Sequence, residues 1–165
     1  MGITNREFKK RRKEIMSRME PNSIGLLSSA PECLRNNDAE YQYRQNSDFY
    51  YLTGFTEPHA ILALVPGREQ GEVILFCREK NEEKELWTGY ILGPEAAIDS
   101  LKIDDAYPIE DVDEIISGLI EGKDRIYYSM GRDDHFDRQV MTWVKNLRNN
   151  AKAVSYTHLT LPTKA

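Results

Sequence analysis

An aromatic-rich stretch of eighteen residues, from Tyr41 to Pro58, constrains the fold of this chain more than any other part of the sequence. It mixes six aromatic residues with polar ones, and their spacing follows neither the period of a helix nor the alternation of a strand. So many rings are rarely left exposed, because each offers a large apolar area that packs best against another surface. We therefore interpret the stretch as an organised part of the fold and not as an ordinary loop.

Two kinds of side chain are expected to organise this stretch. Arg44, Asn46 and Asp48 can hydrogen-bond backbone groups of neighbouring turns, and Asn-Ser-Asp followed by aromatics is typical of a helix start. Gly54 allows a sharp bend. Buried area is expected from four rings: Phe49, Tyr50, Tyr51 and Phe55. The alternative is that these rings line a substrate channel or a subunit contact; we favour the structural role.

The composition is that of one soluble globular domain, with 165 residues of which 40% are apolar and 30% charged. A chain of this length buries about two-thirds of the surface of its unfolded state. The net charge of −5, from 22 basic and 27 acidic residues, argues against nucleic acid and anionic membranes as main partners. No apolar run approaches the roughly 18 residues that span a bilayer.

The location is predicted from the first residues and from the cysteines. The N-terminal residues contain no apolar stretch of the kind that a secretion signal needs. Cys33 and Cys77 are the two cysteines, and they are far apart and outside any Cys-x-x-Cys motif. We expect two free thiols that pack as small apolar groups, as in a reducing compartment. The sequence therefore predicts a cytoplasmic protein.

Apolar runs and capping residues predict a mixed α/β fold. Strands are expected at 23–30, 60–65, 72–77 and 125–130. Helices are expected from Thr4 to the residue before Pro21, at 94–101 and 109–120, and from Asp133 or Asp134 to Leu147. The runs 60–65 and 72–77 are continuous and apolar, as in strands buried on both faces, and the glycines between them predict an antiparallel hairpin. We expect one domain, residues 1–152, with a sheet covered by helices.

The first helix is expected to bury Phe8, Ile15 and Met19. The basic run from Lys9 to Lys13 on the same helix could form a nucleic-acid patch, but we favour a solvated helix face because the chain is acidic as a whole. The last helix has a clearer apolar stripe, made of Phe136, Val140, Trp143, Val144 and Leu147.

The sequence offers few groups of residues that could carry out catalysis. His59, His135 and His158 are far apart, and none has a second ligand at metal-binding spacing. Asp133 to Asp137 forms the one local cluster of acids with a histidine, which we interpret as helix capping rather than as a metal site. The sequence contains no Gly-x-Ser-x-Gly motif and no glycine-rich phosphate loop. We expect no catalytic residue and no metal ligand in this chain.

The segment from Glu85 to Gly93 is unusual because it holds Trp87 among flexible, glycine-punctuated neighbours without a helical stripe that would bury it. The residues before it, Arg78 to Glu85, are expected to form a charged surface crossing. In one interpretation Trp87 covers the edge of the sheet; the alternative is a role outside the domain.

The run from Tyr43 to Phe55, followed by Glu57-Pro58, closely resembles the N-terminal domain of Xaa-Pro aminopeptidases (aminopeptidase P), and the resemblance extends from about Thr4 to about Leu147. It implies a three-layer α/β domain, with a mixed sheet flanked by helices. The family comprises two-domain, manganese-dependent metallopeptidases of the creatinase or "pita-bread" type, which remove the N-terminal residue that precedes proline. Their two manganese ions are bound by two Asp, one His and two Glu of a catalytic domain that this chain lacks, so the chain alone is expected to be inactive.

The resemblance also implies partners for the domain. These are its own catalytic domain, a peptide with proline at the second position, and further copies of the parent in a dimer or tetramer, where the domain restricts access to the active site. Trp87 matches a family tryptophan that can reach a neighbouring subunit's active site and contribute to the substrate's apolar pocket, whereas Tyr90 and Ile91 replace basic residues of other members. The alternative function is a stand-alone, non-catalytic module of the same fold that binds a peptide or protein.

The last residues, 153–165, continue no earlier pattern, because they are rich in threonine and contain no acid. They resemble neither the family's linker nor its catalytic domain. We expect a non-native or disordered tail.

Overall fold

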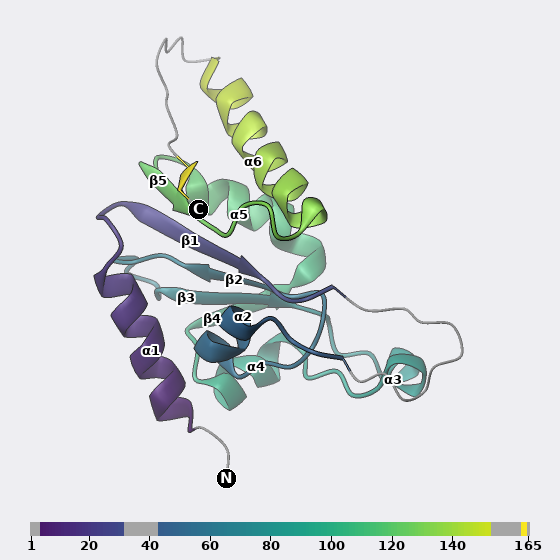
Figure 1. The fold of residues 1–165 in the computed structure, drawn as a ribbon. Coiled ribbons are helices and arrows are strands. Elements are labelled where there is room, and N and C mark those ends of the chain that lie inside the picture. Colours follow the sequence, from purple (N-terminus) through teal and green to yellow (C-terminus); the bar gives the residue numbers. More distant parts are fainter. Residues whose placement is uncertain (1–3, 32–42, 153–162, 165) are drawn as a thin grey trace.

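The computed structural model describes residues 4–31, 43–152 and 163–164 (Figure 1). The helices are α1 (Asn5–Ser17), α2 (Ser47–Thr53), α3 (Glu82–Thr88), α4 (Pro94–Leu101), the 3-10 helix η1 (Ile109–Asp111), α5 (Val112–Ile120) and α6 (Asp134–Lys152). The strands are β1 (Ser23–Ser28), β2 (Ile61–Leu64), β3 (Val73–Cys77), β4 (Asp105–Pro108), β5 (Arg125–Tyr127) and β6 (Thr163–Lys164).

The strands form one mixed sheet in the order β4-β3-β2-β1-β5-β6. The predicted hairpin is confirmed, because β2 and β3 pair antiparallel with Leu62 opposite Leu75. β1 is antiparallel to β2 and parallel to β5, and β3 is parallel to β4. β4 was not predicted from the sequence. It combines an aspartate and a proline with half-buried residues at the end of the strand order, so it lacks the continuous apolar run of a central strand.

Helices cover both faces of the sheet, with α1, α2 and α4 on one side and α5 and α6 on the other (Figure 1). The two faces are separated by the alternation of side chains along each strand. On β2, Ile61 and Ala63 pack with α5 and α6, whereas Leu62 and Leu64 pack with α2 and α4. The prediction of a three-layer α/β domain is thus confirmed.

On α1 the predicted buried stripe is partly wrong. Phe8 is buried as expected, but Ile15 is exposed and Met16 is buried in its place. Arg12 is also buried, so the basic run is not a uniformly solvated face. The reason is that the Arg12 guanidinium bonds the carbonyl oxygens of Leu52 (2.8 Å) and Lys102 (3.1 Å) and ties α1 to the ends of α2 and α4.

The last helix is close to its prediction. Its capping residue is Asp133, whose carboxylate accepts hydrogen bonds from the backbone N–H groups of His135 (3.0 Å) and Phe136 (3.4 Å). Trp143 is only 1% exposed, and its indole N–H donates to Asp113 of α5 (2.7 Å). The remaining residues of the predicted stripe are buried or partly buried: Phe136, Val140, Val144 and Leu147.

The predicted C-terminal tail and the expected lack of a membrane-spanning segment can be compared with the structure only in part. The predicted tail falls largely on residues 153–162 and 165, outside the described residues; Thr163–Lys164 pair parallel with β5. The character of the tail stays a prediction. Within the described residues, no helix combines the length and apolar composition needed to cross a bilayer.

Candidate functional site

The segment of residues 78–93, which connects β3 to α4 and contains α3, is the candidate functional site. The segment Arg78 to Glu85 lies at the surface, as predicted, but from Glu82 onward it forms a helix, α3, that the sequence did not predict. Asn81 starts this helix, because its side-chain oxygen accepts from the backbone N–H groups of Glu83 (3.0 Å) and Lys84 (3.1 Å). At Gly89, with a φ of 88°, the helix ends after two turns.

Helix α3 lies to the side of the layered body, beyond α2 and α4, at the right of Figure 1. It has no buried residue. The Trp87 side chain is 87% exposed, and Leu86 and Tyr90 are also among the exposed large apolar residues. Trp87 therefore does not cover the edge of the sheet. The segment therefore presents three large apolar side chains to solvent.

Two carboxylates hold the chain that returns from α3. The backbone N–H of Ile91 donates to Oε1 of Glu85 (2.8 Å), and that of Leu92 donates to Oε2 of Glu57 (2.9 Å). The other oxygen of Glu57 accepts from Nη2 of Arg78 (3.2 Å), at the beginning of the same segment. Ile91 itself is buried. The base of the segment is thus fixed to the body while α3 itself projects.

Lys80 completes this base. Its Nζ donates to Oε1 of Glu85 (2.8 Å) and to the carbonyl oxygen of Ile91 (3.0 Å), and it lies 4.2 Å from the centre of the Tyr90 ring. The hydrogen bond from Ile91 and then Lys80 lower the pKa of Glu85 below its usual value, and Glu85 raises the pKa of Lys80. Both groups are therefore charged around neutral pH.

A cavity of about 480 Å³ lies beside α3, lined by His59, Arg78, Glu79, Asn81, Lys84, Trp87, Thr88, Ile91 and Glu110. A neighbouring cavity of about 640 Å³ shares His59, Arg78, Lys84 and Glu110 with it. The walls combine both signs of charge with apolar groups, so they resemble the mixed lining of ligand-binding clefts.

The aromatic-rich stretch has a mainly structural role in the described residues. Gln45, which the sequence did not single out, donates from Nε2 to the carbonyl oxygens of Phe55 (3.2 Å) and Glu57 (3.1 Å) and accepts from the backbone N–H of Ala30 (2.7 Å). Asn46 donates to the carbonyl oxygen of Ser28 (3.2 Å), as expected of its amide. The stretch therefore sets the backbone from which Glu57 reaches the α3 segment.

Other expectations for this stretch are partly confirmed. Phe49 and Phe55 are buried, but Tyr50 and Tyr51 are exposed by 40% and 49%, which corrects the prediction for these two rings. The reason is the helical turn of α2, which directs Phe49, Leu52 and Thr53 to the core and leaves Tyr50 and Tyr51 on its outer side. There Arg11 of α1 stacks on the Tyr51 ring at 4.1 Å. Gly54 has a φ of 72° and ends α2, so the sharp bend is confirmed. Arg44 is exposed, and no hydrogen bond joins its side chain to the described residues.

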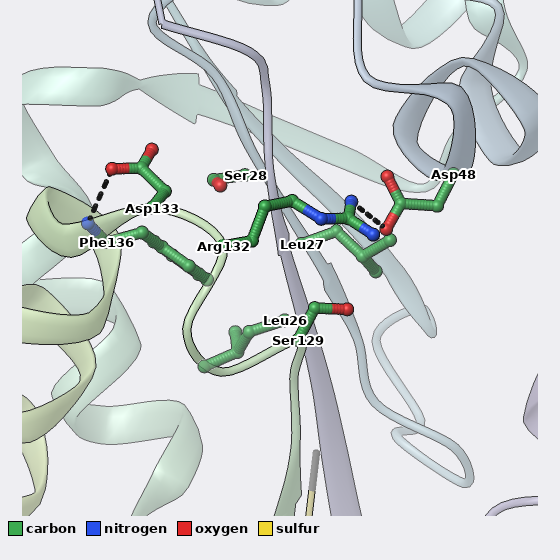
Figure 2. A pocket seen from close by; sticks show the side chains of 8 residues that line it. All are labelled: Leu26, Leu27, Ser28, Asp48, Ser129, Arg132, Asp133 and Phe136. Carbon is green, nitrogen blue, oxygen red and sulfur yellow. Dashed lines mark hydrogen bonds and ion pairs between the residues drawn. The ribbon is translucent and has the colours of Figure 1, made fainter.

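A much smaller hollow lies where β1 ends (Figure 2), and its volume of about 20 Å³ is close to that of one water molecule. Arg132 points across it to Asp48, and Asp133 turns away to its capping bond with Phe136 (Figure 2). This hollow is too small for a peptide side chain. In the residues that the structure describes, no three His, Cys, Asp or Glu side chains are grouped so that they could hold a metal ion, and the residues present do not fit the family's metals.

Comparisons with known proteins agree with the fold. The family model for the aminopeptidase P N-terminal domain matches residues 8–127. The Xaa-Pro aminopeptidase of Escherichia coli (strain K12) is 36% identical over 151 residues, which cover 91% of this chain and 34% of that protein. The one from Haemophilus influenzae is 37% identical over 126 residues, covering 76% of this chain and 29% of that protein.

Solved structures give the same result. Pseudomonas aeruginosa aminopeptidase PepP superposes with a TM-score of 0.89 at 48% identity, covering 98% of this chain and 36% of that one. A zinc-substituted E. coli aminopeptidase P in complex with product has a TM-score of 0.88 at 35% identity, covering 99% of this chain and 37% of that one. The chain thus spans about a third of the length of these relatives. Taken with the three-layer fold, these matches show that the chain belongs to the family of aminopeptidase P N-terminal domains.

Proposed function

We propose that this chain is the N-terminal accessory domain of a cytoplasmic, manganese-dependent Xaa-Pro aminopeptidase, which removes the N-terminal residue that precedes proline. The family match and the Xaa-Pro aminopeptidases among the relatives support this proposal. In the parent, two manganese ions would be held by a separate catalytic domain, and they would supply a metal-activated water as the nucleophile there. No group of side chains in the described part of this chain could hold these ions, so the proposal assigns the metal ligands and the catalytic residues to that other domain. The present chain restricts access to the active site so that only free peptide termini enter, and it supports assembly into a dimer or tetramer.

Trp87 is the residue through which this domain acts on substrate in the proposal. In the oligomer, it reaches the active site of a neighbouring subunit and adds an apolar wall to the substrate's pocket. The observation that supports this role is the 87% exposure of an indole on a helix that buries none of its residues. An exposed tryptophan of this kind is a typical anchor for a surface outside its own domain.

Trp87→Ala tests this role in the full-length parent. We expect kcat/KM on Xaa-Pro peptides to fall about tenfold or more, because an apolar ring is lost from the pocket. The free energy of unfolding of the present chain should change by less than about 0.5 kcal/mol, because the ring is exposed. Met141→Ala, which removes another exposed apolar side chain on α6, is the matched control and should change neither quantity. Unaltered kinetics for Trp87→Ala would remove the substrate role.

The assignment as an accessory domain has its own test. The purified parent should release the first residue from an Xaa-Pro peptide, lose this activity with a chelator and regain it with manganese. The present chain should release nothing under the same conditions. Chelator-sensitive release by the present chain alone would refute the proposal. A reading frame that encodes no second domain with the Asp, His and Glu ligands would leave the alternative, a stand-alone peptide- or protein-binding module.

A further inference from the structure

The orientation of the Trp87 side chain cannot come from packing of α3 against the body of the domain. Helix α3 has seven residues and buries none of them. A helix of this length is unstable by itself in water, because a few hydrogen bonds do not offset the cost of nucleation. The orientation of its indole is therefore set by the groups that close the base of the segment.

Glu57 closes the base by joining its two ends. One carboxylate oxygen accepts from Arg78, directly after β3, and the other accepts from the backbone N–H of Leu92, two residues before α4 begins. The side chains of Glu57 and Arg78 are only 12% and 16% exposed, so water competes weakly for these bonds. Gln45 holds the backbone of Glu57, because its Nε2 donates to the Glu57 carbonyl oxygen.

Lys80 forms a second closure of the same base. It bridges Glu85, in the middle of α3, to the carbonyl oxygen of Ile91, on the returning chain. Glu85 in turn accepts from the backbone N–H of Ile91. The two closures use the backbone N–H groups of consecutive residues, Ile91 and Leu92. Trp87 lies in the sequence before these two residues and after Lys80, so it belongs to the segment that the closures hold.

We propose that Glu57 and Lys80 are positioning residues that hold Trp87 in one orientation toward the neighbouring subunit. The inference rests on the proposed function for the contribution to catalysis, but the immobilisation of Trp87 is a property of this chain alone. Neither residue touches substrate; each acts through the indole. Loss of either closure lets α3 move as a unit on its two connections while the layered body stays folded.

Fluorine NMR on the chain labelled with 5-fluorotryptophan separates these effects, because the chain contains two tryptophans in opposite environments. Trp87 reports on α3, and Trp143, which is 1% exposed, reports on the folded core. In Glu57→Gln and in Lys80→Met, we expect the transverse relaxation rate of the Trp87 resonance to fall about twofold as its motion increases. The Trp143 resonance should keep its shift and its rate.

Glu83→Gln is the matched control, because Glu83 lies on α3 and its side chain has no hydrogen bond or ion pair within the described residues. It should leave both resonances unchanged. If Glu57→Gln unfolds the chain and the core resonance of Trp143 is lost, Lys80→Met decides, since Lys80 is half-exposed and Glu85 keeps its hydrogen bond from the backbone N–H of Ile91. An unchanged Trp87 rate in the folded variants overturns the proposal.

Kinetics in the full-length parent show whether the orientation matters. Glu57→Gln should lower kcat/KM about tenfold, as expected for a displaced pocket wall, with the loss mainly in kcat. On a Trp87→Ala background it should cost nothing more, because the residue acts through the indole. An additive loss overturns the positioning role. If Trp87→Ala leaves kcat/KM unchanged, the proposed function is contradicted. The relaxation rate of Trp87 still tests separately whether Glu57 and Lys80 immobilise the indole.

Discussion

The guanidinium of Arg132 donates from Nη1 to Oδ2 of Asp48 over 2.7 Å, although the two residues lie 84 positions apart in the sequence. Asp48 is in the first turn of α2, and Arg132 lies in the connection from β5 to α6. The bond passes over the end of β1 (Figure 2) and joins α2, on one face of the sheet, to the connection that leads into α6, on the other face.

We predict that this link contributes little to stability. The side chains of Arg132 and Asp48 are 49% and 34% exposed, and a pair so accessible to water contributes at most about 1 kcal/mol. Arg132→Ala should therefore lower the free energy of unfolding in urea by less than about 1 kcal/mol, and salt should reduce the difference. A loss above about 2 kcal/mol would show that the pair is more protected from solvent than its exposure indicates.

The buried Arg12 should behave in the opposite way. Arg12→Ala leaves the carbonyl oxygens of Leu52 and Lys102 without their donor and opens a cavity between α1 and the ends of α2 and α4. We expect the free energy of unfolding to fall by about 2–4 kcal/mol. The neighbouring Lys13→Ala, at an exposed position of the same basic run, should cost less than about 0.5 kcal/mol. Equal effects of the two variants in urea denaturation would contradict this assignment.

The contrast between Arg12 and Lys13 shows what sequence patterns could and could not predict. The central strands β2 and β3 were predicted because continuous apolar runs can only be buried. A buried arginine leaves no such pattern, since its partners are carbonyl oxygens that lie 40 and 90 residues away. Helix α3 was missed for a related reason: it has no buried face, and Asn81 with the acids that follow it is the one local signal.

The candidate site was predictable only in part. Trp87 was singled out because no apolar stripe accompanies it, and its exposure agrees with that reasoning. Glu57 and Gln45 were not, because their significance depends on contacts across the fold. Glu57 meets the backbone of Leu92, 35 residues later, and one glutamate in a charged chain carries no signal of such a contact. Patterns along the sequence predict which residues are buried, whereas hydrogen bonds between distant segments can be identified only once the fold is known.

Cys77 should be inert in the native chain. It is fully buried in β3, and burial first, then the nearby charge of Glu57, raises the pKa of its thiol to about 12. Alkylating reagents attack the thiolate, which is then nearly absent around neutral pH. In a Cys33→Ser variant, iodoacetamide should leave the chain unlabelled without denaturant and add one label in urea, as measured by intact mass. Rapid labelling of the native chain would show that β3 opens locally.

The closure by Lys80 and Glu85 gives the mobility of Trp87 a defined pH dependence. The pKa of Glu85 is lowered below 4.5 by the N–H of Ile91 and then by Lys80, so its contribution is present above that value and is lost as the pH falls through the lowered pKa. Glu85 raises the pKa of Lys80 above 10.5, so the contribution of the ammonium is present below that value and is lost only as the pH rises through the raised pKa. The relaxation rate of the fluorinated Trp87 should therefore be flat between pH 4.5 and 10.5 and fall outside this window.

Glu85→Ala provides the decisive comparison, because it removes the acceptor for both Lys80 and Ile91. In this variant the transverse relaxation rate of the Trp87 resonance should be low at neutral pH and should not fall further at acid or alkaline pH. The Trp143 resonance reports any general unfolding. A variant that keeps the wild-type rate and its acid step would show that Glu85 is not the group that holds the segment. A wild-type rate that already declines above pH 4.5 would mean that the pair does not hold the segment.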